Sequence, residues 1–176
     1  MFTSIYILWI KERKKMTDNN NIRQAQIKDV DAIYEIVREN PEEVLPRAYQ
    51  DILAHFDRFY VYDDGEIRGV VSWQMMPVID LDEPDFCIEL VSLSVTEAYM
   101  AKGIGRRLVE KMISVIEKMQ PHRIIVLTYY PEFFSKFGFV ETSKEKLYQK
   151  IYQVCINCTK HKSPLTCPEV AMELKI

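Results

Sequence analysis

Residues 88–105, IELVSLSVTEAYMAKGIG, combine a carboxylate with a glycine pair, and both features could take part in chemistry. Glu89 stands among apolar, strand-like residues, and Gly103 and Gly105 open an amphipathic run. Backbone N–H groups at the start of a helix have no partner within the helix, so together with the helix dipole they bind anions such as phosphate. Glycine lets the main chain turn sharply and approach a ligand without a Cβ in the way. The segment predicts an anion-binding loop beside a carboxylate; the competing interpretation is an ordinary turn and a surface charge at a strand end.

A strand before the glycines and a helix after them would position these groups. Apolar residues recur every three or four positions after Gly103, which predicts a helix with one buried stripe: Ile104, Leu108, Met112, Val115 and Met119. Apolar and β-branched residues dominate 88–95, which predicts a strand. Strand alternation then places four side chains on one face of the sheet: Glu89, Val91, Leu93 and Val95.

The chain has 176 residues, of which 48% are hydrophobic, and a formal net charge of −3. This length and composition predict one globular domain with a substantial core. The net negative charge gives no electrostatic reason to expect a nucleic acid or an anionic membrane surface as a partner.

The first ten residues, MFTSIYILWI, are apolar but too short to span a bilayer. Basic residues follow this run rather than precede it, the reverse of a secretory signal peptide. We expect residues 1–20 to be a disordered or mis-started extension, with Met16 as the functional start; a helix lying on a membrane is the alternative. Residues 21–176 would form the domain, and a reducing cytoplasm is the expected compartment.

Strand-like and helix-like segments are mixed along this domain. Strands are predicted around 22–26, 59–62, 67–75, 88–95, 124–129, from 139 onward and 170–174, and helices around 30–37, 49–56, 104–119 and 131–136. Asp63-Asp64-Gly65 between two of the strands indicates a tight hairpin. The order predicts an α/β (α+β) domain with a mixed, mostly antiparallel sheet flanked by helices.

With these elements placed, residues 22–176 resemble the GNAT (Gcn5-related) N-acetyltransferase superfamily. The superfamily signature, a strand followed by Q/R-x-x-G-x-G/A, becomes MAKGIG at 100–105, and FFSKFGF at 133–139 matches a second landmark. Met100 replaces the usual Gln or Arg, but the main-chain amides that hold a pyrophosphate do not depend on that side chain. The resemblance implies a single GNAT-type domain that uses acetyl-coenzyme A (acetyl-CoA). It assigns the binding of acetyl-CoA to Leu93, Ser94, Val95, Met100, Ala101, Lys102, Gly103, Ile104, Gly105 and Arg106.

A narrower resemblance is to the short N-acetylglutamate synthase-like branch. It rests on Leu45-Pro46-Arg47, ELVSLSV at 89–95, LTYYPEFF at 127–134 and a Cys-rich tail that ends in EVAM at 169–172. This resemblance implies acetylation of the amino group of glutamate, the opening step of arginine biosynthesis, by direct attack in a ternary complex. Arg47 would bind a substrate carboxylate through its two parallel donors, with a surface arginine as the competing interpretation.

Glu89 is the predicted general base, because burial beside apolar groups makes a carboxylate more basic. The superfamily commonly places a proton-donating tyrosine at the position of Phe134, which has no proton to give. Coenzyme A would then leave as a thiolate, or Tyr129 or Tyr130 would supply the proton. Both tyrosines could equally be packing residues.

Three cysteines and a histidine gather near the C-terminus. Cys155, Cys158, His161 and Cys167 have the spacing C-x2-C-x2-H-x5-C, which could bind zinc although it differs from a standard knuckle. Reduced thiols or a redox-labile pair are the alternatives. The fourth cysteine, Cys87, fits a small apolar core residue.

Two other functions stay open from the sequence. The acidic segment Asp80–Asp85, if it lies near a pocket mouth, would favour a cationic amine, and acetylation of a protein N-terminus is a related alternative. The departures at Met100 and Phe134 would also fit a catalytically silent acyl-CoA-binding sensor. The expected partner of an enzyme is a small amino acid or amine, and a homodimer is compatible with the chain.

Overall fold

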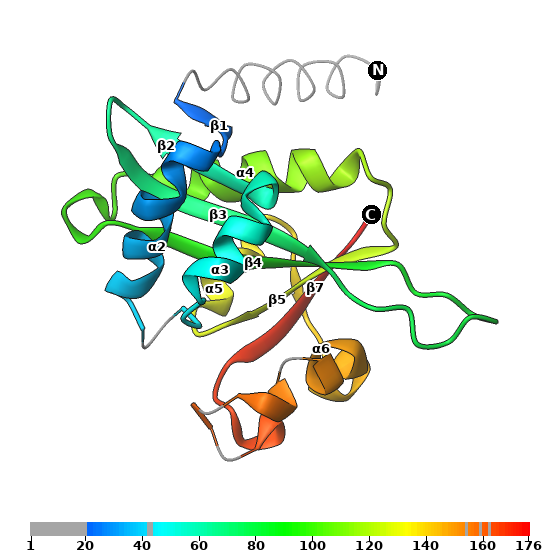
Figure 1. Cartoon of the computed structure of the whole chain (residues 1–176). Helices are drawn as coiled ribbons and strands as arrows, with labels where there is room; N and C mark the ends of the chain where they lie inside the picture. The colour runs from blue at the N-terminus through cyan, green and yellow to red at the C-terminus, as the bar shows by residue number, and fades with distance from the viewer. Residues whose placement is uncertain (1–20, 42–43, 154, 159, 162) are drawn as a thin grey trace, which may run out of the picture.

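The computed structural model describes residues 21–41, 44–153, 155–158, 160–161 and 163–176, so the predicted extension at 1–20 lies outside the described residues. The described residues form one seven-stranded sheet in the order β1-β2-β3-β4-β5-β7-β6 (Figure 1). The pair β4 and β5 is parallel and the other five pairs are antiparallel, which confirms the predicted fold class. The strands are β1 (Ile22–Gln24), β2 (Phe59–Asp63), β3 (Ile67–Met75), β4 (Cys87–Val95), β5 (Arg123–Thr128), β6 (Val140–Glu141) and β7 (Val170–Lys175).

Helices cover both faces of this sheet (Figure 1). The α-helices are α2 (Val30–Glu39), α3 (Tyr49–Ala54), α4 (Ile104–Glu117), α5 (Pro131–Ser135) and α6 (Tyr148–Gln153). Val71 of β3 packs with α4 and with Phe134 of α5, whereas its neighbour Val70 packs with α2 and Ile52 of α3. Because neighbouring residues of a strand point to opposite faces, α4 and α5 lie on one face, and α2 and α3 on the other. None of the described helices is long and apolar enough to cross a membrane.

The buried stripe of α4 differs from the prediction in its last turns. Ile113 and Ile116 are buried, whereas Val115 is half-buried and Met119 is 41% exposed beyond the end of the helix. A step of four residues from Met112 keeps a side chain closer to the stripe than a step of three, because a turn has 3.6 residues. The prediction is therefore wrong after Met112, where the buried side of the helix continues through Ile116 rather than through Val115 and Met119.

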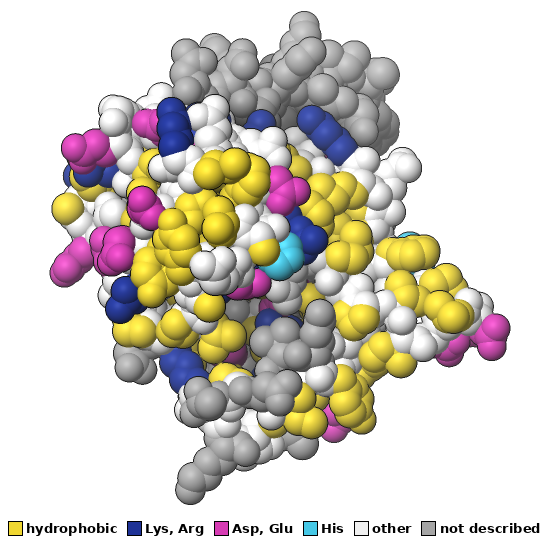
Figure 2. Space-filling view, viewed as in Figure 1, with side chains coloured by type: hydrophobic (Ala, Val, Ile, Leu, Met, Phe, Trp, Pro, Cys, Tyr) yellow, Lys and Arg dark blue, Asp and Glu magenta, His cyan; other side chains and the backbone are white. Residues whose placement is uncertain are grey.

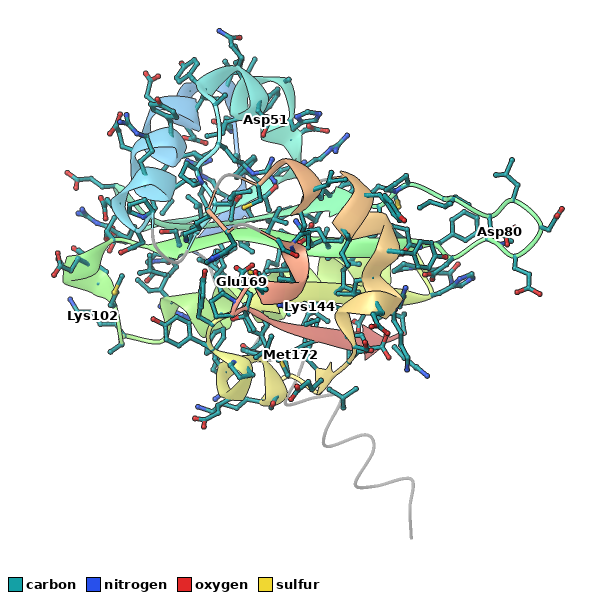
Figure 3. All side chains as sticks on the ribbon, turned by 90° about the horizontal axis from the view of Figure 1, so that it is seen from below. Asp51, Asp80, Lys102, Lys144, Glu169 and Met172 are labelled. Carbon is teal, nitrogen blue, oxygen red and sulfur yellow. The ribbon has the colours of Figure 1, made fainter. Side chains whose placement is uncertain are left out.

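The long connection between β3 and β4 projects away from the sheet. Its apolar side chains Ile79, Leu81 and Phe86 are 52%, 84% and 47% exposed. Figure 2 shows hydrophobic and acidic side chains together on this projection. In Figure 3, Asp80 marks this tip, opposite the end of the molecule where Lys102 lies.

Candidate active site

A cavity of about 680 Å³ opens where β4 and β5 separate. The two strands pair from Cys87 opposite Arg123 to Glu89 opposite Ile125, and β4 then continues to Val95 paired with β3 but no longer with β5. Backbone groups on that side of β4 have no neighbouring strand and face the space that opens. The cavity runs from the loop before α4, along β4, to Glu89 and to side chains contributed by the C-terminal part of the chain. Residues 80–85, which would favour a cationic amine if they lay near a pocket mouth, are not part of its lining.

A bulge in β4 overturns the predicted one-face arrangement of Glu89, Val91, Leu93 and Val95. The register between β3 and β4 shifts between Val91 and Ser94, and Ser92 has a φ of 55°, in the left-handed region. An extra residue in one strand reverses the alternation beyond it. Leu93 and Val95 consequently pack with the cluster under α4, as Ile88 and Leu90 do, while Glu89 points to the opposite face.

The loop before α4 forms the other end of the cavity. Gly103 is the N-cap residue of α4 and has a φ of 79°, a conformation that glycine adopts without strain. The first intrahelical bond runs from the N–H of Arg107 to the carbonyl of Gly103, so the amides of residues 104–106 have no partner within the helix.

Most of the predicted cofactor residues line the cavity: Leu93, Val95, Met100, Ala101, Gly103, Ile104, Gly105 and Arg106. Two predicted residues lie outside its lining. The ammonium of Lys102 makes a cation–π contact with the ring of Tyr99, 4.3 Å from the ring centroid. The hydroxyl of Ser94 donates to the carbonyl of Ile36 at 3.0 Å, so this side chain ties β4 to α2.

Glu89 lies in polar surroundings rather than the apolar ones that were predicted. Its side chain is buried, and both carboxylate oxygens are 2.8 Å from the Nζ of Lys150 on α6. The amide of Gln74 on β3 also donates to this carboxylate, at 3.0 Å. Lys150 lines the cavity but is itself buried, with only 8% of its surface exposed. The site therefore contains a buried ion pair rather than an isolated acid.

Lys150 was not among the predicted site residues. One signal was present: Lys150 lies three positions after Leu147, which is buried, so both occupy one face of a helical segment. A lysine on the buried face of a helix needs an anionic partner. Nothing in the local sequence indicates that Glu89, 61 positions earlier, is that partner.

Arg47 lies behind the cavity wall, in a network that leads to Glu89. Its guanidinium donates to the hydroxyl of Ser92 at 2.9 Å, to Asp51 at 2.6 Å and to the side-chain oxygen of Gln74 at 3.1 Å. Ser92 lines the cavity and Arg47 does not. Arg47, Gln74, Glu89 and Lys150 thus form a continuous polar row at the Glu89 end of the cavity.

The aromatic residues after β5 also line the cavity. The hydroxyl of Tyr129 is 3.1 Å from Nε2 of His161, and Tyr130 is 53% exposed. Phe134 is 4% exposed and packs edge-to-face on Phe133, with ring centroids 5.1 Å apart. Phe134 therefore stabilises the core beneath the cavity wall and offers no proton.

The predicted zinc ligands line a smaller neighbouring cavity of about 30 Å³. In the part of the chain that the structure describes, no His, Cys, Asp and Glu side chains form a group that could hold a metal ion. His161 faces Tyr129 instead, and Cys167 lies 3.5 Å from the carboxylate of Glu169. Burial raises the pKa of the Cys155 and Cys167 thiols. The structure gives no support to zinc.

Cys87 behaves as the sequence predicted, as a small core residue. It is buried at the start of β4, and burial raises the pKa of its thiol to about 12.

Comparisons with known proteins agree with this geometry. The family described as the acetyltransferase (GNAT) family matches residues 30–139. An uncharacterized N-acetyltransferase of Chlorobaculum tepidum is 34% identical over 154 residues, which cover 86% of this chain and 93% of the relative. An amino-acid acetyltransferase of Mycobacterium tuberculosis is 28% identical over 122 residues, 68% of each chain.

Among solved structures, the N-acetylglutamate synthase of Neisseria gonorrhoeae, complexed with coenzyme A and N-acetyl-glutamate, superposes with a TM-score of 0.68 at 22% identity. The match covers 88% of this chain and 34% of the synthase. At this identity the likeness concerns the fold.

Proposed function

The chain belongs to the acetyltransferase (GNAT) family, and on that premise we propose that it acetylates the α-amino group of a small amino acid, with L-glutamate as the leading candidate. The acetyl donor is acetyl-CoA, and the amine would attack it directly in a ternary complex. One observation carries this proposal: a single cavity joins the amide-lined loop before α4 to the buried carboxylate of Glu89. Donor and acceptor can therefore meet in one continuous space.

The donor end of the cavity fits a pyrophosphate. The amides at the start of α4 provide unpaired N–H donors and the positive end of the helix dipole. Arg106, which lines the cavity and is paired with Glu110 at 2.9 Å, adds a positive charge beside them. Acetyl-CoA supplies the activated acetyl group when it is bound.

Glu89 would accept the proton of the incoming amine, directly or through a water molecule. The unpaired side of β4 at residues 93–95 would donate a backbone N–H to the oxygen that becomes negative in the transition state. Tyr129 and Tyr130, both in the cavity wall, are the available proton donors for the departing thiolate. Tyr129→Phe and Tyr130→Phe, assayed separately, identify the donor by loss of turnover; wild-type turnover in both variants indicates departure as a thiolate.

The acceptor end favours an acidic amino acid. Arg47 would bind a substrate carboxylate after it releases Gln74, since a guanidinium recognises carboxylates in a bidentate manner. The names of two similar proteins, an amino-acid acetyltransferase and an N-acetylglutamate synthase, support the same acceptor class. A role in arginine biosynthesis would follow from that acceptor.

Release of free thiol from acetyl-CoA tests the proposal. The purified full chain is assayed with single amino acids, polyamines and short peptides with free N-termini, and products are identified by mass spectrometry. We expect thiol release with L-glutamate or a close analogue and N-acetylation of its α-amine. Binding of acetyl-CoA without release with any acceptor would contradict the proposal and indicate an acyl-CoA-binding sensor.

A further inference from the structure

The partner of Glu89 is the least expected feature of the acceptor end. Lys150 comes from α6, is buried, and lines the cavity with its ammonium 2.8 Å from the Glu89 carboxylate. Removing two charges from water is costly, and a buried ion pair often contributes no net stability compared with apolar residues of similar size. Stability alone is therefore a weak reason for this pair.

The position of the pair suggests a different reason. An α-amino acid carries an ammonium group and a carboxylate on the same carbon atom, so it presents two opposite charges a short distance apart. Glu89 and Lys150 present the complementary two charges inside the cavity. When the substrate enters, one ion pair can be exchanged for two: the substrate ammonium with Glu89, and the substrate carboxylate with Lys150.

Arg47 is less suited to that carboxylate. It lies outside the cavity lining and is separated from Glu89 by Gln74, whereas Lys150 contacts Glu89 directly. The two cations thus flank Glu89 on either side along the polar row. A dicarboxylic amino acid whose amine sits at Glu89 has one carboxylate next to that amine and another several bonds away.

We infer that Lys150 is a specificity-determining residue that binds the α-carboxylate of the acceptor, leaving Arg47 for the side-chain carboxylate. This inference rests on the proposed acetyl transfer to an amino acid and adds the residue that selects α-amino acids over simple amines. It also gives Lys150 a role beyond attaching α6 to the sheet.

Three acceptors test the recognition of each carboxylate independently. They are L-glutamate, L-isoglutamine, in which the α-carboxylate is an amide, and L-glutamine, in which the side-chain carboxylate is an amide. Values of kcat/KM are measured for each in the wild type, Lys150→Met, Lys150→Arg and the exposed control Lys146→Met. The three acceptors differ in the intrinsic reactivity of their amines. This difference cancels when the same ratio of kcat/KM values, such as glutamate to isoglutamine, is compared between two variants.

We expect Lys150→Met to lower the glutamate-to-isoglutamine ratio by roughly 10- to 100-fold, the loss of a charged hydrogen bond, with much less change in the glutamate-to-glutamine ratio. Lys150→Arg should restore part of the first ratio, and Lys146→Met should leave both ratios at wild-type values. Equal losses for glutamate and isoglutamine in Lys150→Met would overturn the inference, because a purely structural role affects both acceptors alike.

Calorimetric binding of the same acceptors to the CoA-loaded wild type supplies a second readout, which matters if Lys150→Met does not fold. A preference for L-glutamate over L-isoglutamine that is weaker in CoA-loaded Lys150→Arg than in the wild type supports the inference, and equal binding of the two acceptors to the wild type contradicts it. Absence of thiol release with all acceptors would contradict the proposed function, while these binding preferences would still test the role of Lys150.

Discussion

The two ends of the cavity are built in different ways. The donor end consists mainly of backbone amides from one short segment, the loop and first turn of α4. The acceptor end depends on side chains from four separate segments: Glu89 and Lys150 line the cavity, and Gln74 and Arg47 lie behind them in the polar row. A backbone site tolerates side-chain changes such as Met100, whereas a side-chain site loses its chemistry when one member changes.

Glu89→Gln should show the largest effect and acts on the acceptor end alone. We expect kcat/KM for the acceptor to fall about 10²- to 10⁴-fold, the usual contribution of general acid–base catalysis, with the KM for acetyl-CoA nearly unchanged. Steady-state kinetics with both substrates varied measure the two effects. Glu97→Gln, on the exposed turn before the loop, is the control. A Glu89→Gln enzyme with near-normal turnover over the assay pH range would remove Glu89 from the mechanism.

Arg47→Ala tests whether the polar row behind the wall binds substrate. We expect the KM for L-glutamate to rise roughly 10- to 100-fold, because a charged hydrogen bond is lost. Arg47→Lys should restore the charge but only part of the affinity, since it lacks the planar fork. The control is Arg38→Ala on the exposed surface of α2, where the side chain is 53% exposed. An unchanged KM in Arg47→Ala would show that Arg47 only supports Ser92 and Gln74.

Gly103→Ala tests the backbone-built end. A residue with a Cβ at a φ of 79° is strained by about 1–2 kcal/mol, so we expect the KM for acetyl-CoA to rise about 5- to 30-fold. Gly65→Ala is the matched control, because its φ of 110° makes the added Cβ strained in the same way, but it lies in the β2–β3 hairpin outside the cavity lining. Equal effects of the two substitutions on the KM for acetyl-CoA would mean that the strain does not act through the loop before α4.

The thiols beside the acceptor end should show the smallest effect. Folding raises the pKa of Cys155 and Cys167 through burial, so both stay protonated at neutral pH and their contribution to stability declines as the pH becomes alkaline. We expect native protein to react with iodoacetamide more slowly than unfolded protein near neutral pH, as followed by mass spectrometry. Equal rates in the native and unfolded states would place these thiols in solvent.

The same contrast explains what the sequence could predict. The helix α4 and its glycine loop were predicted because periodicity and turn chemistry are local. The bulge at Ser92 was not, because it depends on the register with β3 and no glycine marks it. Lys150 was missed because its partner lies 61 positions away. The helix and turn that form the donor end were therefore predictable, and the side-chain network of the acceptor end only in part.

The projecting connection between β3 and β4 affects how the protein behaves in concentrated solution. Its exposed Ile79, Leu81 and Phe86 alternate with acidic residues at 80, 82, 83 and 85. Those charges keep neighbouring molecules apart, and exposed apolar patches promote association once the repulsion is lost. Added salt screens surface charges, so the protein's solubility should fall as the salt concentration rises while its fold stays intact.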